Sequence, residues 1–331
     1  MPDHDVTLVI PARNAADTLP DCLRAAKAVL GEEGLRAITV VDDGSTDDTG
    51  AIAVALGAHV IRGHGQGPAA ARNLGWRAAR TPLIWFVDAD CVIEAGALRI
   101  LKHQLREGDV GAVGGSYGNM REDSMIASLI HEEIVERHLR MPNEVNFLAT
   151  FNVVFRKDVL EQVGGFDEHF LKAQDVELAY RVKEAGWRLG FDARSRVKHF
   201  HLSSFWKYLE VQRKQGYWRM WLYLKHPRRM TGDSYSGWMD YVQPPLAMAS
   251  LGALFCAPWS WLPLGMCVGI LSLLQLPMAM RIVRRTQRLR YASYIPFGMI
   301  RAYWRGVGMS HGLVAAGLKS KATPRSQAHP R

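Results

Sequence analysis

The chain opens with four short apolar runs, at residues 6–10, 37–41, 58–62 and 83–87. Between the first two runs, apolar residues recur at helical spacing from Asp17 to Leu30, and the helix-terminating Gly31 and Gly34 follow. Similar helix-like segments separate the later runs. This alternation of strand and helix predicts an α/β domain with a parallel, wound sheet.

The fourth run ends in two acidic residues, Asp88 and Asp90. Its apolar residues predict a strand that is buried on both faces. Ligands bind outside the carboxyl ends of strands in open α/β sheets, so the two carboxylates stand where a ligand would bind. They need a counter-charge to stay ionised side by side, and a divalent cation is the simplest one. The motif alone leaves open a solvated turn with two helix-capping acids.

A glycine-rich segment follows the third run. Residues 65–70 fit the G-x-G-x-x-G/A pattern of dinucleotide-binding loops, with an acidic residue about twenty positions further on. The segment follows the third strand instead of the first, however, and the acidic residue belongs to the paired carboxylates. We therefore interpret it as a loop that approaches a substrate and opens a helix whose N-terminus faces phosphate.

The composition narrows the class of protein. The chain has 331 residues, 48% of them hydrophobic, which is enough for a substantial core. Its formal net charge of +9 favours either a nucleic-acid or a membrane-surface partner. Because the cationic residues cluster beside an apolar region and not on an RNA-reading module, we expect membrane lipid as a partner and no nucleic acid.

The cysteines and the N-terminal segment indicate the compartment. Cys22, Cys91, Cys256 and Cys267 form no CxxC pair. They predict neither a disulfide framework nor a zinc site, and therefore a reducing compartment. The N-terminal segment lacks the charged and apolar regions of a signal peptide, so we expect the catalytic part to stay in the cytosol.

Residues 241–280 contain no charged residue. A transmembrane helix needs about twenty apolar residues, and here two prolines and two tryptophans within residues 257–263 interrupt the stretch. The pattern predicts a membrane hairpin with its turn at an interface, one helix at residues 245–256 and the other at residues 264–280. The short first arm leaves a re-entrant or interfacial position open, and a hydrophobic soluble subdomain is the alternative.

Basic residues flank this hairpin on both sides, namely Lys225, Arg228 and Arg229 before it and Arg281, Arg284, Arg285, Arg288 and Arg290 after it. Basic flanks favour the cytosolic side, so we expect both ends and the catalytic domain on that side of the inner or plasma membrane. Residues 206–240 predict an amphipathic helical linker suited to lipid headgroups. Residues 281–331 predict a basic, amphipathic helix and, from Ala322, a disordered tail.

Six motifs occur in a fixed order and spacing within the first 205 residues. They lie at residues 11–14 (PARN), 41–47 (VDDGSTD), 71–73 (ARN), 88–90 (DAD), 164–168 (GGFDE) and 174–181 (QDVELAYR). Together they resemble family 2 glycosyltransferases of the GT-A fold, of a membrane-associated bacterial type. The resemblance implies a Rossmann-like α/β/α catalytic domain over residues 1–205, followed by a C-terminal helical membrane-associated region.

The resemblance assigns several residues to a nucleotide-diphosphate sugar donor. Asp42 matches the residue that binds the nucleobase, and Pro11 and Arg13 shape the same pocket. Asp43 is expected either to help hold the ribose or to orient the loop. Arg72 is expected to add a cationic contact, with a helix-end pair at the surface as the alternative.

The resemblance also implies a divalent cation, Mg²⁺ or Mn²⁺, at the donor diphosphate. Asp90 is expected to be the direct metal ligand, and Asp88 to contact the ribose or a metal-bound water. His199 matches a position that closes the metal or diphosphate site in related transferases, although a packed or surface histidine would look the same. Residues 197–201 predict a strand with His199 and His201 on one face.

The acceptor side follows from the later motifs. Asp175 matches the catalytic base, which deprotonates the acceptor as it attacks the anomeric carbon, so direct displacement predicts inversion. Gln174 replaces the usual glutamate before it, which affects acceptor contacts and leaves the base intact. Asn152 lies in a segment that resembles the loop flanking the acceptor. For Glu177 and Arg181, on the helix that follows, the alternative to a role in the site is an ion pair at i,i+4 spacing, which contributes only tenths of a kcal/mol.

We therefore expect an inverting, metal-assisted glycosyltransferase that passes a sugar from a nucleotide-diphosphate sugar to a lipid-linked or cell-envelope glycan acceptor. Transfer to a polyprenyl monophosphate is the alternative among enzymes. An inactive, transferase-like membrane anchor is the alternative outside them.

Overall fold

The computed structural model describes residues 5–227 and 233–322, with the side chains of residues 5–227 and 233–318. The expectations for Arg228, Arg229 and the tail beyond Ala322 lie outside the described residues. The chain forms two compact units. The first comprises the residues up to Ser203 together with Asp233–Ser236, and the second comprises the rest of the described chain.

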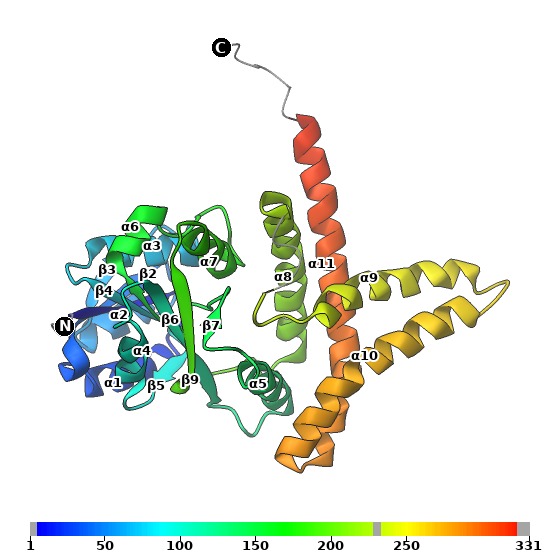
Figure 1. The fold of residues 1–331 in the computed structure, drawn as a ribbon, viewed down its shortest axis with the longest axis horizontal. Helices are drawn as coiled ribbons and strands as arrows, with labels where there is room; N and C mark the ends of the chain where they lie inside the picture. The colour runs from blue at the N-terminus through cyan, green and yellow to red at the C-terminus, as the bar shows by residue number, and fades with distance from the viewer. Residues whose placement is uncertain (1–4, 228–232, 323–331) are drawn as a thin grey trace. The chain divides into compact units, whose positions relative to one another are not determined.

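Within the described residues, one sheet of nine strands forms the centre of the first unit (Figure 1). Its order is β3-β2-β1-β4-β8-β6-β9-β5, and β7 pairs with β9. The strands are β1 (Val6–Ala12), β2 (Leu35–Asp42), β3 (His59–Arg62), β4 (Leu83–Val87), β5 (Cys91–Ile93), β6 (Val110–Asn119), β7 (Glu144–Val145), β8 (Asn152–Arg156) and β9 (Arg188–His199).

The sheet is parallel only in its first half. β3, β2, β1 and β4 run parallel, as the alternation of elements predicted. β8 pairs antiparallel with both β4 and β6, and β5 pairs antiparallel with β9, so the second half is mixed. The parallel half positions the first four motifs, because the loops after its strands all lie at the same edge.

Helices cover both faces of this sheet. Successive residues of β1 point to opposite sides, so that Leu8 and Ile10 belong to one hydrophobic core and Val9 to the other. The first core is completed by α1 (Leu19–Ala28), α2 (Thr49–Ala55) and α4 (Ala97–Gln104). The second is completed by α3 (Pro68–Ala78), α6 (Lys157–Val163) and α7 (Gln174–Glu184). A further helix, α5 (Met125–His138), contacts β6.

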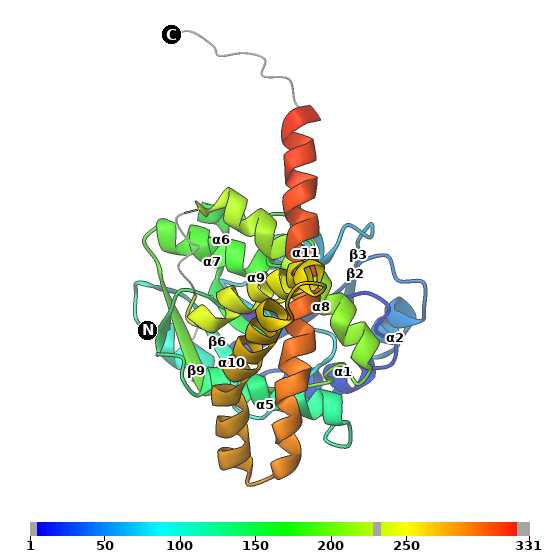
Figure 2. The ribbon, with the colours of Figure 1, turned by 90° about the vertical axis from the view of Figure 1, so that its right-hand side faces the viewer.

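Four long helices form the second unit, which Figure 2 shows with α11 running past the other three. They are α8 (Phe205–Lys225), α9 (Trp238–Ala253), α10 (Leu262–Thr286) and α11 (Tyr294–Ala322), with 3₁₀ turns at Leu254–Cys256 and Leu289–Ser293. α8 begins one residue before the segment that we expected to be a linker, residues 206–240, and occupies its first half. It packs along α11 as part of the helical unit.

Glycines allow α8 and α11 to meet backbone to backbone. A Cβ atom on Gly308 of α11 would collide with the carbonyl oxygen of Arg213 in α8. A Cβ atom on Gly216 of α8 would likewise collide with the carbonyl oxygen of Arg305 in α11. Small residues at a crossing point let two helices approach this closely.

α9 and α10 form a helical hairpin over the segment where one was predicted. The first arm begins at Trp238, before the predicted start at residue 245, because Asp240 caps it by accepting a hydrogen bond of 3.0 Å from the backbone nitrogen of Gly237. α10 is longer than predicted at both ends. Among the described residues, α10 is the one helix that is long and apolar enough to cross a membrane.

We predict opposite effects for two alanine substitutions on α11. Gly308→Ala should destabilise the second unit by about 1–3 kcal/mol, because the backbone of α8 blocks the added methyl group. Gly317→Ala should stabilise it by up to about 1 kcal/mol, because a Cβ atom there meets no neighbour and alanine favours the helix. Thermal unfolding in detergent, followed by circular dichroism, measures both. Equal effects of the two substitutions would contradict the close crossing.

Candidate active site

The carboxyl ends of β1, β2 and β4 lie side by side at one edge of the sheet, because β1 pairs in parallel with both neighbours. Pro11 and Ala12 end β1, and Ala12 is paired with Asp42 at the end of β2. Asp88 directly follows β4. The structure thus brings three of the predicted donor-binding motifs to the same edge.

Hydrogen bonds connect the loops that follow β1, β2 and β3. The backbone nitrogen of Asn14 donates to Ser45 Oγ (3.0 Å), and Asp42 Oδ1 accepts from the backbone nitrogen of Ser45 (3.0 Å). The guanidinium of Arg13 donates to the carbonyl oxygen of Gly65 (3.2 Å). Arg13 and Asp42 are therefore held in adjoining loops, as a shared nucleobase pocket requires.

Asp43 orients the glycine-rich loop. Its side chain is buried, and it accepts hydrogen bonds from the backbone nitrogens of Gln66 (3.1 Å) and Gly67 (2.7 Å). Gly67 has a φ of 103°, which favours glycine, and α3 begins directly after it. Of the two roles that we considered for Asp43, the structure provides the loop-orienting one.

Arg72 and Asp88 form a close ion pair. Arg72 NH2 lies 2.6 Å from Asp88 Oδ1, and the side chains are 4% and 32% exposed. Burial raises the pKa of Asp88 above its usual range and the charge of Arg72 opposes that rise. Among the described residues, Nε and NH1 of Arg72 have no hydrogen-bond partner. Arg72 is thus a buried counter-charge and not the surface residue of the alternative interpretation.

Asp90 and His199 meet where β5 pairs with β9. Cys91 lies opposite His199 in this ladder, and the backbone nitrogen of Phe200 donates to the carbonyl oxygen of Asp90 (3.0 Å). This pairing brings His199 Nε2 within 3.2 Å of Asp90 Oδ2. Burial alone would raise the pKa of Asp90, but the imidazole beside it lowers that pKa below its usual value.

The donor atoms around Asp90 fit a hard or borderline divalent cation. Asp90, Cys91 and His199 each offer a ligand atom, and these atoms lie within 4.8 Å of one another. Burial and the neighbouring acids raise the pKa of the Cys91 thiol well above its usual value, so the thiol stays protonated and is a poor ligand. A carboxylate and an imidazole remain, and water and phosphate oxygens can complete the coordination of Mg²⁺ or Mn²⁺.

His201 orients the imidazole of His199. The two Nδ1 atoms are 2.8 Å apart, so one ring donates a hydrogen bond to the other. This contact leaves Nε2 of His199 directed at Asp90. Burial lowers the pKa of His201 to about 2, which keeps its ring neutral. We expected both rings on one face of a strand, and the structure adds the hydrogen bond between them.

Asp175 and Gln174 begin α7, after Ala173 with a φ of 62°. Backbone N–H groups at a helix N-terminus favour the anionic form of a carboxylate. Asp175 is half-buried, and its Oδ1 accepts from the backbone nitrogen of Val176 (2.9 Å). Gln174 is 7% exposed, and its Oε1 has no hydrogen-bond partner within the described part of the chain. A water or a ligand donor would satisfy this acceptor.

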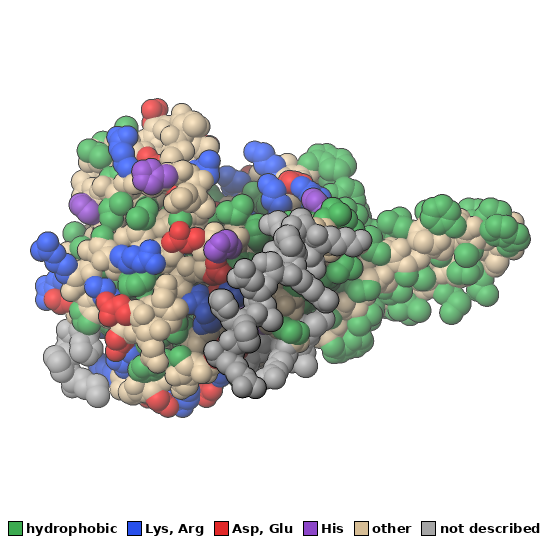
Figure 3. Space-filling model, turned by 90° about the horizontal axis from the view of Figure 1, so that it is seen from above, with side chains coloured by type: hydrophobic (Ala, Val, Ile, Leu, Met, Phe, Trp, Pro, Cys, Tyr) green, Lys and Arg blue, Asp and Glu red, His purple; other side chains and the backbone are tan. Residues whose placement is uncertain are grey.

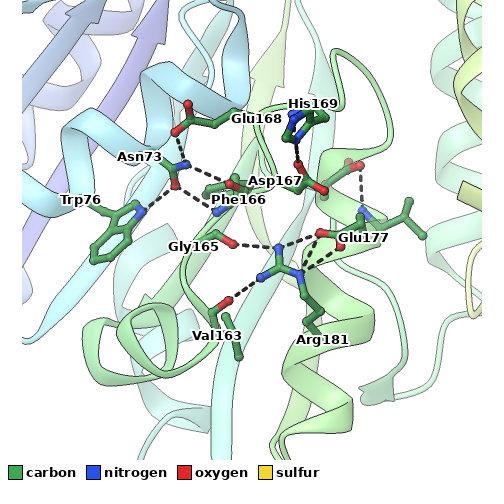
Figure 4. A network of polar contacts seen from close by, with 12 residues as sticks. Asn73, Trp76, Val163, Gly165, Phe166, Asp167, Glu168, His169, Glu177 and Arg181 are labelled. Atoms are coloured by element: carbon green, nitrogen blue, oxygen red, sulfur yellow. Dashed lines mark hydrogen bonds and ion pairs between the residues drawn. The ribbon is translucent and has the colours of Figure 1, made fainter. Parts of the chain in front are cut away.

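Asn73 holds the segment that leads to α7, a role that the sequence analysis missed. Its side chain donates to the carbonyl oxygen of Phe166 (2.9 Å) and to Glu168 Oε1 (2.7 Å), and it accepts from the backbone nitrogen of Phe166 and from Trp76 Nε1, both at 2.9 Å (Figure 4). One buried amide therefore ties α3 to the loop before Asp175. The sequence signal that could have indicated this role is the position of Asn73 next to Arg72 in the ARN motif.

Glu177 and Arg181 form the predicted ion pair, and it is more than a surface pair. Arg181 NH2 lies 2.6 Å from Glu177 Oε2, and the Glu177 side chain is 0% exposed. The same guanidinium donates to the carbonyl oxygens of Val163 (2.5 Å) and Gly165 (2.7 Å), as Figure 4 shows. The pair clamps α7 to the end of α6 and so fixes the position of Asp175.

We expected Asn152 in a loop that flanks the acceptor, and the structure places its side chain inside the core. Asn152 is fully buried at the start of β8. Its Oδ1 accepts from Trp85 Nε1 (3.0 Å), and its Nδ2 donates to Ser195 Oγ (3.1 Å). The amide satisfies two polar groups inside the core and has no free face for an acceptor.

A further buried histidine, His138, lies at the end of α5. Its Nδ1 is 2.8 Å from Ser116 Oγ in β6, and its ring lies 5.1 Å from that of Phe191. Burial, with the nearby charges of His131 and Arg137, lowers its pKa to about 3. The imidazole is therefore neutral at physiological pH and acts as a packed polar group beside the sheet.

Comparisons with known proteins identify the family of the chain. Residues 7–164 match the family model described as glycosyl transferase family 2. An uncharacterized glycosyltransferase of Mycobacterium bovis is 31% identical over 188 residues, which cover 56% of this chain and 81% of that protein. The chain belongs to the family 2 glycosyltransferases.

Two other similarities bear on its length and fold. A pre-mycofactocin glycosyltransferase of Mycobacterium tuberculosis is 30% identical over 261 residues, which are 72% of this chain and 53% of that protein, so the chain spans about half of its length. The solved structure of the mannosyltransferase PcManGT from Pyrobaculum calidifontis, in complex with GDP-Man and Mn²⁺, has a TM-score of 0.59 at 18% identity and covers 94% of this chain and 87% of that one. The GT-A fold with a helical C-terminal region is thereby confirmed.

We predict that Arg72→Met destabilises the first unit by about 1–3 kcal/mol, because it leaves the carboxylate of Asp88 without its counter-charge. Adding Asp88→Asn should recover part of this loss. The control Arg77→Met removes an exposed cation from the same helix and should cost at most about 1 kcal/mol. Urea unfolding measures all three variants. No coupling between Arg72 and Asp88 in this cycle would contradict the pair.

We also predict a pH dependence from His138. An unfolded imidazole takes up a proton near pH 6.5, whereas folded His138 does so only near pH 3, so the unfolded state binds more protons in between. Stability should therefore fall as the pH drops below 6.5, with His138 contributing about 2 kcal/mol between pH 7 and pH 5. Urea unfolding at both values should show a smaller difference for His138→Asn. The exposed control His169→Asn should leave the difference unchanged.

Proposed function

We propose that the protein transfers a sugar from a nucleotide-diphosphate sugar to a lipid-linked or envelope-glycan acceptor, with inversion at the anomeric carbon. The observation that carries this proposal is the set of charges after β4, where Asp88 is paired with Arg72 and Asp90 with His199. A donor diphosphate and its cation need this combination of carboxylate, imidazole and guanidinium groups.

Donor binding involves the loops after β1, β2 and β3. Asp42 accepts hydrogen bonds from the nucleobase, and Pro11 and Arg13 border the same pocket. Asp43 acts through the glycine-rich loop that it orients. The structure of PcManGT with GDP-Man and Mn²⁺ supports a nucleotide sugar and a metal for this fold.

A divalent cation, Mg²⁺ or Mn²⁺, held by Asp90 and His199 would neutralise the diphosphate and stabilise the leaving nucleotide. Asp88 contacts the ribose or a water near that site, while Arg72 keeps its carboxylate in place. His201 holds the His199 ring so that Nε2, and not Nδ1, faces the ligand.

Asp175 is the proposed general base. It accepts the proton of the acceptor hydroxyl as that oxygen forms the bond to the anomeric carbon and the bond to the nucleotide diphosphate breaks. Attack from the side opposite the leaving group inverts the anomeric centre. The clamps at Asn73 and Arg181 hold the base in position, and Gln174 lies beside it on the acceptor side.

The acceptor class rests on the helical unit. Its hairpin is uncharged over residues 241–280, and α10 is apolar enough for a membrane, which fits an enzyme that works at a lipid surface on the cytosolic side. A lipid-linked acceptor would be within reach of such an enzyme, and membrane lipid would be its second partner.

Donor binding and turnover test the proposal. UDP-, GDP- and dTDP-sugars are titrated with and without Mn²⁺ in detergent, and one donor class should bind in a metal-dependent way. Asp90→Ala should abolish the metal dependence. Asp175→Asn should keep donor binding and lower turnover by about 10²–10⁴-fold.

Asp158→Ala serves as the matched control, because Asp158 is exposed at the start of α6, at the opposite edge of the sheet. It should behave like the unaltered protein. A folded protein that binds none of the donors would overturn the proposal in favour of an inactive membrane anchor.

A further inference from the structure

The outer part of the α9–α10 hairpin, residues 251–270, is exposed and is called the bare stretch below. From residue 251 to residue 270 no residue is buried, and none is charged. Figure 3 shows this projecting hairpin covered with hydrophobic side chains. The large exposed ones are Leu251, Leu254, Phe255, Trp259, Trp261, Leu262, Met266 and Ile270. A surface of this kind in water is rare unless another apolar phase covers it.

The bare stretch begins where contact with α11 ends. Ser250, 1% exposed, shares a hydrogen bond of 2.7 Å with Tyr303 of α11. Leu271, fully buried, belongs to the same small core as Ala247 and Ala302. Both arms of the hairpin therefore pack against α11 as far as Ser250 and Leu271, and the residues between these two positions are not buried.

We propose that residues 251–270 insert into the acyl chains of a single membrane leaflet and that the hairpin does not span the bilayer. The proposal deepens the membrane association of the proposed function and rests on it. The lipid hydrocarbon is then the one partner that covers this surface. The enzyme would be a monotopic membrane protein, bound to the cytosolic leaflet on the side where the nucleotide-sugar donor is supplied.

The length of the two exposed arms determines how deeply the hairpin can enter the bilayer. Ser260 lies in the middle of the stretch, so each arm contributes about ten residues, or about 15 Å at the rise of an α-helix. The hydrocarbon core of a bilayer is about 30 Å thick, so this length fills one leaflet.

Charged groups at the base of the hairpin prevent deeper insertion. Gly306 of α11 is so close to Pro244 and Met248 of α9 that a Cβ atom on it would clash with them. Next to this contact, Arg305 donates to Gln212 Oε1 of α8 (2.6 Å) and lies 4.0 Å from Asp240.

α8 carries further charges at the same crossing. Gly308 of α11 abuts the backbone of Arg213, whose side chain pairs with Glu210 at 2.8 Å. Lys214 beside it is 54% exposed. A spanning hairpin would draw these groups into the hydrocarbon, where exposed charges are strongly disfavoured.

The turn itself suits a lipid environment. Backbone groups in hydrocarbon must find partners within the protein. At the tip, the backbone nitrogens of Trp259 and Ser260 donate to the carbonyl oxygen of Cys256 at 3.0 and 2.9 Å. The backbone nitrogen of Leu262 donates to Ser260 Oγ at 3.2 Å. The tip therefore enters the bilayer with these donors already satisfied.

Cysteine accessibility in sealed membranes tests the depth. The background is the full-length protein with Cys256→Ala and Cys267→Ala. Single cysteines are then placed at the tip by Ser260→Cys or by Gly265→Cys, since a Cβ atom at Gly265 meets no neighbour. A third variant, Lys214→Cys, places the cysteine at the base. Spheroplasts and inside-out vesicles of the expression host are treated with a membrane-impermeant maleimide. The remaining Cys22 and Cys91 are buried and give the background.

Insertion into one leaflet predicts that Lys214→Cys is labelled only in inside-out vesicles, and that both tip cysteines are labelled in neither preparation until detergent is added. Labelling of Ser260→Cys in spheroplasts would show a spanning hairpin and overturn the proposal. Labelling of the tip in inside-out vesicles would show that the hairpin stays in water.

Sugar transfer by the same vesicles separates this proposal from the proposed function. Vesicles that consume donor while their tip cysteines react from either side refute the single-leaflet insertion alone. Vesicles with protected tip cysteines and no activity on any donor refute the enzymatic proposal alone.

Discussion

Two carboxylates at the end of one buried strand impose the constraint around which the site is built. Asp88 and Asp90 lie one residue apart after β4, and neither stays ionised at low cost unless positive charge is placed beside it. The fold provides that charge from two directions, with Arg72 from α3 on Asp88 and His199 from β9 on Asp90. A cation and a diphosphate are the ligands that we propose for these groups.

The rest of the first unit serves this arrangement. The β5–β9 pairing sets the distance between His199 and Asp90, and the mixed half of the sheet is what brings β9 to β5. Asn73, on the same helix as Arg72, fixes the loop before α7, and the Arg181 clamp fixes α7 itself. Side chains of α3 therefore contact both Asp88 and the loop before α7, so disturbing that helix should affect the proposed donor and acceptor residues alike.

The sequence was sufficient for the parallel strands, the six motifs and the hairpin, because apolar runs, strand-end acids and a long uncharged segment leave plain local patterns. It was insufficient where a role depends on a partner far along the chain. Asn152 is a single polar residue at the start of a strand, and only the fold shows that Trp85 and Ser195 use its amide. Arg72 could be surface or core until Asp88 was placed beside it. The mixed half of the sheet was equally hidden, because strand direction depends on long-range pairing.

We propose that Asp90 and His199 hold the cation at the end of β4. Pulsed electron paramagnetic resonance of Mn²⁺ bound together with a nucleoside diphosphate tests it directly, because a coordinated imidazole nitrogen couples to the electron spin. We predict a nitrogen coupling that is lost in His199→Gln and retained in His169→Gln, whose parent imidazole is exposed. Bound Mn²⁺ without any imidazole coupling in the unaltered protein would contradict the claim.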